Sequence, residues 1–156
     1  MKALVVYYSR TGLTRKVADK LAVELGADKE EIIDKTNRMG VMGYIRSGKE
    51  AYQKILADIE APKINPSNYD LVIVGTPVWA ATMSSPVRAY LTAQKDKIKR
   101  AAFFATQGGS SDCKALNHMA DLAGLKSSGS FVASSKEVVK DDYRAKLSQF
   151  VKIIRE

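Results

Sequence analysis

The first segment of the chain constrains the fold most. Residues Ala3–Tyr8 form an unbroken apolar and aromatic run, which is typical of a strand buried on both faces of a parallel sheet. The run changes abruptly into the polar stretch Ser9-Arg-Thr-Gly-Leu-Thr14. From Leu13 to Leu25 apolar residues recur at helical spacing, which predicts an amphipathic helix that ends at Gly26. A strand, a loop and a helix are therefore expected in direct succession.

The loop between this strand and this helix has the chemistry of an anion site. Gly12 lets successive N–H groups converge at the start of the helix, where unpaired amides and the helix dipole favour an anion. The only Gly-Lys pair, Gly48-Lys49, is followed by Glu50, and the turn lacks the G-x-G-x-x-G pattern, which excludes nucleotide-hydrolysing and dinucleotide loops. We predict that the loop holds a phosphomonoester without cleaving it. The alternative is that its hydroxyls only cap the helix.

The rest of the chain alternates between apolar runs and helical patterns. We expect one domain over residues 1–156, with further strands at Glu31–Asp34, Leu71–Gly75, Ala101–Thr106 and Ser130–Ser134. Four further helices are expected: one from near Ser47 to Ile59, one after an N-cap at Ser85, one that ends at Gly124 and one along the last residues of the chain. Residues Ala61–Pro66 are expected to form a linker. This alternation predicts an α/β fold, a doubly wound parallel sheet with helices on both faces.

Three polar loops follow the first, third and fourth strands of this pattern. They are Ser9–Thr14, Thr76–Ser84 and Gln107–Cys113, and ligands of such sheets bind where the carboxyl ends of the strands meet. Trp79, the only tryptophan, is expected in the second loop, where it either stacks on a ligand or covers the sheet edge.

These motifs together resemble the flavodoxin family. Ser9–Thr14 after the first strand is similar to the FMN phosphate loop of that family, and Asp70–Leu91 is similar to the segment that carries its flavin-stacking aromatic residue. The resemblance extends over residues 1–156 and implies a short-chain, flavodoxin-like sheet with strand order 2-1-3-4-5 and FMN as the cofactor. The residues that it assigns to FMN are Ser9, Arg10, Thr11, Gly12, Leu13, Thr14, Thr76, Pro77, Val78, Trp79, Ala80, Gln107, Gly108, Gly109, Ser110 and Asp112.

The resemblance also implies how these residues act. Trp79 would stack on the flavin ring, the hydroxyl of Thr76 would contact the ribityl chain or ring edge, and the amides from Gln107 to Ser110 would bind the pyrimidine end. Asp112 would either cap the next helix or accept a hydrogen bond from the flavin. Many flavodoxins have a second stacking tyrosine in the third loop, but this chain has none there. One flavin face is then open, unless Tyr44 covers it.

The expected activity is electron transfer through FMN, with no catalytic side chain of the protein itself. The alternative is an FMN-dependent oxidoreductase that uses NAD(P)H and a quinone at the open face. The partner is accordingly a redox protein or these small molecules. With 25 Lys and Arg against 17 Asp and Glu, a nucleic-acid-binding module is a further alternative, but the basic residues are scattered rather than gathered in a stripe.

Few other chemistries fit the composition. One cysteine, Cys113, cannot form an internal disulfide, and His118 without further ligands indicates a structural histidine rather than a metal site. No apolar stretch is long enough for a signal-peptide core or a membrane span, so we expect a cytoplasmic protein.

Overall fold

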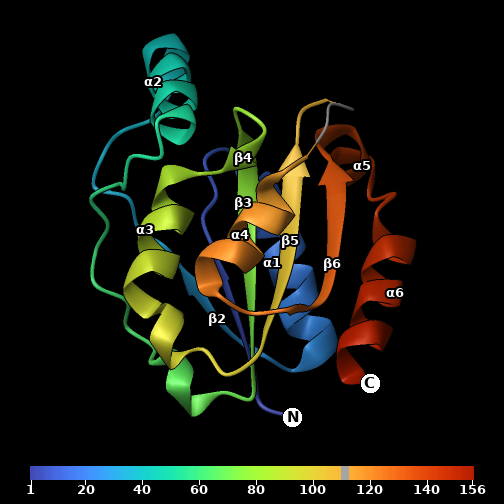
Figure 1. Cartoon of the computed structure of the whole chain (residues 1–156). Coiled ribbons are helices and arrows are strands. Elements are labelled where there is room, and N and C mark those ends of the chain that lie inside the picture. Colours follow the sequence, from blue (N-terminus) through green and yellow to red (C-terminus); the bar gives the residue numbers. More distant parts are fainter. Residues whose placement is uncertain (110–112) are drawn as a thin grey trace.

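The computed structural model describes residues 1–109 and 113–156, and a parallel sheet forms its centre (Figure 1). The strand order is β2-β1-β3-β5-β6, and the short β4 pairs antiparallel with the end of β3. This confirms the expected order 2-1-3-4-5 for the parallel strands. The strands are β1 (Ala3–Tyr7), β2 (Asp28–Glu31), β3 (Leu71–Trp79), β4 (Thr82–Met83), β5 (Ala101–Gln107) and β6 (Ser127–Ser134).

Helices cover both faces of the sheet. The α-helices are α1 (Leu13–Leu25), α2 (Gly40–Tyr52), α3 (Ser85–Gln94), α4 (Ala115–Ala123), α5 (Ser135–Lys140) and α6 (Arg144–Arg155), and Pro66–Asn68 and Lys95–Lys97 are 3-10 turns. One core joins one face of the strands to α1, α5 and α6, and a second core joins the other face to α3 and α4. Among the described residues, no helix is long and apolar enough to cross a bilayer.

Alternate residues of the central strands feed the two cores. In β1, Val5 and Tyr7 enter the core under α1, while Leu4 and Val6 enter the core under α3. Both faces are therefore covered, which is why this strand shows no polar alternation in the sequence. The predicted helix Leu13–Leu25 is confirmed, and Gly26 ends it with φ of 60°.

Two predictions between residues 28 and 59 are wrong. β2 lies at Asp28–Glu31, not at Glu31–Asp34, because it is an edge strand of charged, exposed or half-exposed residues with no apolar signal. α2 spans Gly40–Tyr52, not Ser47–Ile59. It ends where Lys54 turns to a positive φ of 57°, so the apolar residues that follow belong to an irregular segment.

The position predicted for Trp79 also needs correction. β3 continues through Trp79 and turns into β4, with Trp79 opposite Thr82, so the indole ends a strand rather than lying in a loop. Ala80 and Ala81, with φ of 49° and 64°, form the two-residue turn. The residue that precedes α3 is Ser84 rather than Ser85, and its side chain does not cap the helix. β6 begins three residues earlier than expected, and α5 was not predicted.

Candidate functional site

A cavity of about 520 Å³ opens at the carboxyl edge of the sheet. This volume lies within the range of small-molecule and cofactor pockets. The expected loops after β1, β3 and β5 contribute to its wall, and so does α2. The lining residues are Arg10, Thr11, Leu13, Thr14, Tyr44, Ile45, Ser47, Gly48, Pro77, Val78, Trp79, Ala80, Thr106, Gln107, Gly108 and Ser135.

The first loop turns tightly around a serine. Ser9 Oγ accepts hydrogen bonds from the N–H groups of Gly12 (3.0 Å) and Arg15 (3.2 Å), and Gly12 has φ of 99°. Ser9 thus caps amides near the start of α1, as the alternative interpretation of the sequence predicted for the hydroxyls of this loop. The start of α1 nevertheless faces the cavity, because Thr11, Leu13 and Thr14 line it. The first-turn amides of a helix have no intrahelical acceptor, so this end of the cavity suits an anion.

Arg10 connects this loop to the segment before α2. Its Nε donates to the carbonyl oxygen of Arg38 at 2.9 Å, and its guanidinium carbon lies 5.7 Å from the centre of the Tyr44 ring. A cation and an aromatic ring thus lie next to each other at the cavity wall. The positive charge of Arg10 adds to the anion preference of the helix N-terminus.

Trp79 is held by two neighbours. Tyr8 meets its ring edge-on, with 5.5 Å between the ring centroids and 85° between the ring planes. The guanidinium of Arg38 lies 5.2 Å from the centre of the indole ring. Burial and the charge of Asp34 raise the pKa of Tyr8 to about 12, so its ring stays neutral at physiological pH. The indole is therefore positioned before any ligand arrives.

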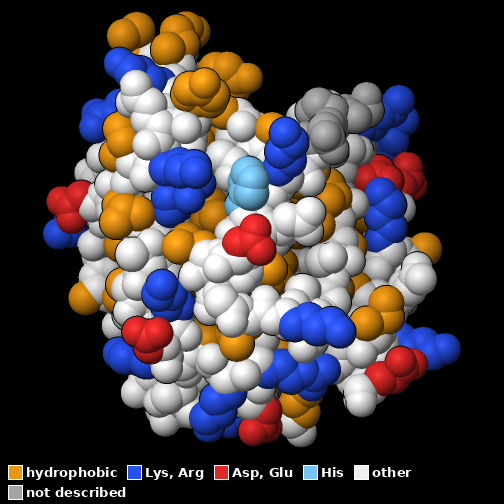
Figure 2. All heavy atoms as spheres, viewed as in Figure 1, with side chains coloured by type: hydrophobic (Ala, Val, Ile, Leu, Met, Phe, Trp, Pro, Cys, Tyr) orange, Lys and Arg blue, Asp and Glu red, His pale blue; other side chains and the backbone are white. Residues whose placement is uncertain are grey.

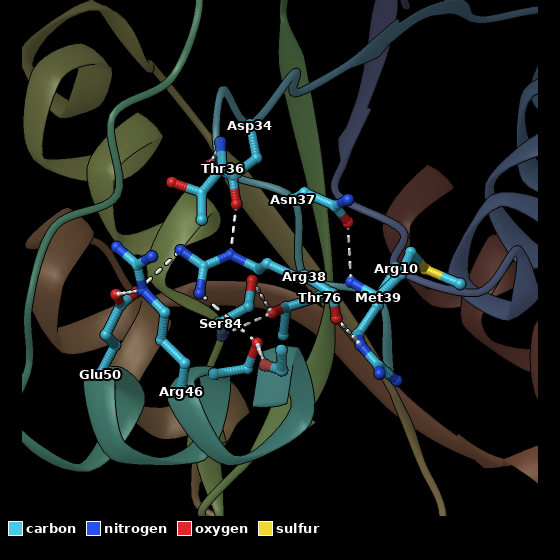
Figure 3. A network of polar contacts seen from close by, with 12 residues as sticks. Arg10, Asp34, Thr36, Asn37, Arg38, Met39, Arg46, Glu50, Thr76 and Ser84 are labelled. Atoms are coloured by element: carbon cyan, nitrogen blue, oxygen red, sulfur yellow. Dashed lines mark hydrogen bonds and ion pairs between the residues drawn. The ribbon is translucent and has the colours of Figure 1, made fainter. Parts of the chain in front are cut away.

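Arg38 is the centre of a buried polar network that the sequence analysis missed (Figure 3). Its side chain pairs with Asp34 and with Glu50, the latter at 2.8 Å, and Arg46 approaches Glu50 from outside at 2.7 Å. Burial raises the pKa of Glu50, but the hydrogen bonds from Arg46 and Arg38 outweigh it and hold this pKa below its ordinary value. The network ties α2 to the segment after β2 and thereby places Tyr44 and Ile45 at the cavity.

The third loop contributes backbone and small side chains. Gln107 and Gly108 line the cavity, and the carbonyl oxygen of Gln107 accepts a hydrogen bond from Ser135 at 3.2 Å. Gly109 is exposed and is not part of the lining. The predicted contacts of Ser110 and Asp112 lie outside the described residues.

The structure thus brings together most of the residues that the sequence assigned to the site. Thr76 is an exception because it is fully buried, where its oxygen accepts from the Ser84 N–H (3.0 Å) and its hydroxyl donates to the Pro77 carbonyl (2.9 Å). Its contact with a ligand stays a prediction. The sequence missed the wall residues Ile45, Ser47, Gly48, Thr106 and Ser135, which carry no motif. It did name Tyr44.

The arrangement accommodates a flat ring with an anionic tail. Trp79, Tyr44, Val78 and Ile45 give one part of the cavity an aromatic and aliphatic wall, and Arg10, Thr11 and the start of α1 give the other part positive charge and hydrogen-bond donors. No group of His, Cys, Asp and Glu that could hold a metal ion occurs in the described parts of the chain. His118 Nδ1 lies 2.7 Å from Thr82 Oγ1.

Comparison with known proteins points to the same kind of ligand. The family model described as Flavodoxin matches residues 2–140. A flavoprotein from Lactobacillus acidophilus NCFM, crystallised in complex with FMN, is similar with a TM-score of 0.70 and 25% identity over 92% of this chain and 98% of its own. A protein from Bacteroides eggerthii described as a flavoprotein has a TM-score of 0.75 and 25% identity over 96% of this chain and 98% of its own.

More distant structures share the fold alone. An NADH:FMN oxidoreductase in its apo form has a TM-score of 0.62 and 19% identity over 99% of this chain and 89% of its own. No curated protein sequence matches the chain.

Proposed function

The chain belongs to the flavodoxin family, and from this premise we propose that it binds FMN in the cavity and carries electrons between redox partners. The observation that supports this most is the cavity itself. One opening contains an anion-binding helix start, a positioned indole and a glycine loop, which are the three parts that FMN needs for its phosphate, its ring and its pyrimidine edge.

Each part of the wall has a defined task in this proposal. Arg10, Thr11 and the amides of Leu13 and Thr14 at the start of α1 hold the phosphate, and Trp79 stacks on the ring. Gly108 leaves room for the backbone of the third loop to approach the pyrimidine end. When bound, FMN supplies one- and two-electron chemistry, and the protein supplies binding, orientation and electrostatics.

A second candidate function is an FMN-dependent oxidoreductase that takes NAD(P)H and a quinone. Two observations favour it: the described part of the third loop offers no aromatic side chain, and Tyr44 leaves 69% of its surface exposed. A nicotinamide or quinone ring could then lie on the flavin face that Trp79 does not cover. This function differs from a carrier because reduction and oxidation would both take place on small molecules.

A ligand titration tests FMN binding. Since Trp79 is the only tryptophan, added FMN should quench the protein fluorescence and give a visible flavin spectrum. Riboflavin, which lacks the phosphate, should bind at least about tenfold more weakly, because it forfeits the charge-assisted hydrogen bonds at Arg10 and the start of α1. A protein that stays colourless and does not bind added FMN would rule out the proposal.

A turnover assay then distinguishes the two functions. The FMN-loaded protein is mixed with NADPH, with NADH and with a soluble quinone, and the oxidation of the nucleotide is followed. An electron carrier shows no sustained turnover without a reductase. Steady oxidation by the protein alone would favour the oxidoreductase.

A further inference from the structure

The helix α2 reverses the usual amphipathic arrangement. Its inward residues are small or polar, namely Gly43, Ser47, Glu50 and Ala51, and all of them are buried. Its outward face includes large apolar residues beside Arg46 and Lys49: Val41 is 75% exposed, Met42 78% and Tyr52 80%. A helix on a globular protein normally buries its apolar face and exposes its polar face. The outward face of α2 therefore needs an explanation beyond folding.

The cavity accounts for only part of this face. Tyr44 and Ile45 line the cavity and are available to a bound flavin, but Val41, Met42 and Tyr52 are not among the lining residues. Exposed apolar residues also flank the helix on both sides. Together they form what we call the α2 surface: Met39, Val41, Met42, Tyr44, Ile45, Tyr52, Ile55 and Leu56. Figure 2 shows hydrophobic side chains gathered at the top of the molecule, where Figure 1 places α2.

Three basic residues border the α2 surface. Arg46, Lys49 and Lys54 are exposed on or directly after the helix. The one acidic residue of α2, Glu50, is turned inward and neutralised by Arg38 and Arg46. The whole chain carries a net charge of +8. A partner of this surface should therefore be apolar in its centre and anionic around it.

We propose that the α2 surface docks on a lipid bilayer that contains anionic headgroups. Exposed apolar side chains bordered by Lys and Arg are the pattern of helices that lie in a membrane interface. Tyr44 and Tyr52 have the amphipathic rings that favour this depth. A second copy of the chain fits less well, since two such surfaces would bring like charges together. The helix extends beyond the rest of the molecule (Figure 1), so it can enter a headgroup layer, whereas a protein partner would have to provide a groove.

Docking in this way would place the cavity beside the lipid, because Tyr44 and Ile45 belong to the cavity and to the α2 surface at once. This consequence rests on the proposed function. If FMN occupies the cavity, the electron donor or acceptor that reaches it most directly is an apolar molecule dissolved in the membrane, such as a lipid-soluble quinone.

Vesicle co-sedimentation of the full chain tests the docking step. The probes are vesicles of phosphatidylcholine alone and vesicles with equal parts of phosphatidylcholine and phosphatidylglycerol. We expect binding to the mixed vesicles only, and weaker binding at high salt because the charges are screened. Val41→Asp should lower the bound fraction at least about tenfold, since a carboxylate then enters an anionic interface. The matched control is Val23→Asp in α1, where the valine is 78% exposed, and it should bind like the parent protein.

Several outcomes would overturn the proposal. These are no binding to the mixed vesicles, equal binding by Val41→Asp, which would mean attraction by net charge alone, or an equal loss in Val23→Asp. A dimer in analytical ultracentrifugation that Val41→Asp dissociates, without vesicle binding, would assign the surface to a second copy. Sedimentation is measured on FMN-free protein as well as on FMN-loaded protein. The docking proposal can therefore fail while FMN binding holds, and FMN binding can fail while docking holds.

Discussion

The two helices beside the cavity are attached to the molecule by opposite means. α1 packs on the sheet through Val17, Ala18 and Leu21, which are fully buried, and all of its charged residues are exposed or half-exposed. α2 turns small and polar residues inward and exposes its large apolar ones. The first helix is therefore held by apolar burial, and the second by the ion pair of Arg38 with Glu50 and by the close approach of Gly43 to the backbone of Arg38. It follows that different substitutions should release each of them.

The largest expected effect is the loss of the buried cation. Arg38→Met leaves Asp34 and Glu50 without the partner that neutralises them inside the protein. We expect the free energy of unfolding, measured in urea, to fall by about 3–5 kcal/mol. The control is Arg46→Met, because Arg46 is 60% exposed at its side chain and should contribute less than about 1 kcal/mol. Equal losses in the two variants would contradict an anchor at Arg38.

The next effect concerns apolar burial. Here the loss of stability should be large for a substitution in α1 and small for one in α2. Leu21→Ala removes a fully buried side chain of α1 and should cost about 2–5 kcal/mol in urea unfolding. Tyr52→Ser removes a larger apolar side chain from α2, but this residue is 80% exposed, so its effect should stay within about 0.5 kcal/mol. A comparable loss in Tyr52→Ser would show that α2 also depends on apolar packing.

The same contrast explains what the sequence could predict. β1, β3, β5 and α1 stand out because their apolar residues pack locally and at regular spacing. The site followed from topology, since parallel strands bring the loops at Ser9, Pro77 and Gln107 to one edge. The fold prediction depended on which residues are apolar and on the order of the elements, while the site residues came from the polar loops and from the resemblance to a family.

The parts that the sequence did not predict depend on contacts between distant residues. The ion pair of Arg38 with Glu50 bridges two segments and leaves no periodic pattern. An inverted helix misleads any argument that assumes apolar residues face inward, and this moved the predicted α2 seven residues along the chain. The β3–β4 hairpin was missed because Ala80 and Ala81 occupy turn positions that usually carry Asn or Gly.

A smaller effect should follow from the backbone contact of α2. A Cβ atom at Gly43 would lie 2.2 Å from the carbonyl oxygen of Arg38, so Gly43→Ala must push the helix away and should cost about 1–3 kcal/mol. Gly48 lies five residues further in the same helix, with nothing within 4 Å of the position of its Cβ. Gly48→Ala should therefore stabilise the protein by roughly 0.5–1 kcal/mol. Urea unfolding that gave the two variants the same sign would mean that the helix is not in close contact at Gly43.

The smallest expected effect is that of pH on the docking of α2. It is negligible near neutral pH and grows in acid. The pKa of Glu50 is lower in the folded protein than its ordinary value of 4.5. Its carboxylate therefore stabilises the docked helix fully above that ordinary value, and this stabilisation is lost as the pH falls through the lowered pKa. The protection of the α2 amides, which is their exchange rate relative to that of an unstructured peptide at the same pH, should accordingly fall below pH 4.5. In Glu50→Gln the α2 amides should exchange faster at neutral pH, and their protection should respond less to acid, because the titrating group is gone.

Glu137→Gln provides the control, since the pKa of Glu137 is also lowered, by a hydrogen bond from Lys146, but this residue lies in α5. If the α2 amides of Glu137→Gln also lost their acid response, the titration would belong to the whole fold and not to the attachment of α2.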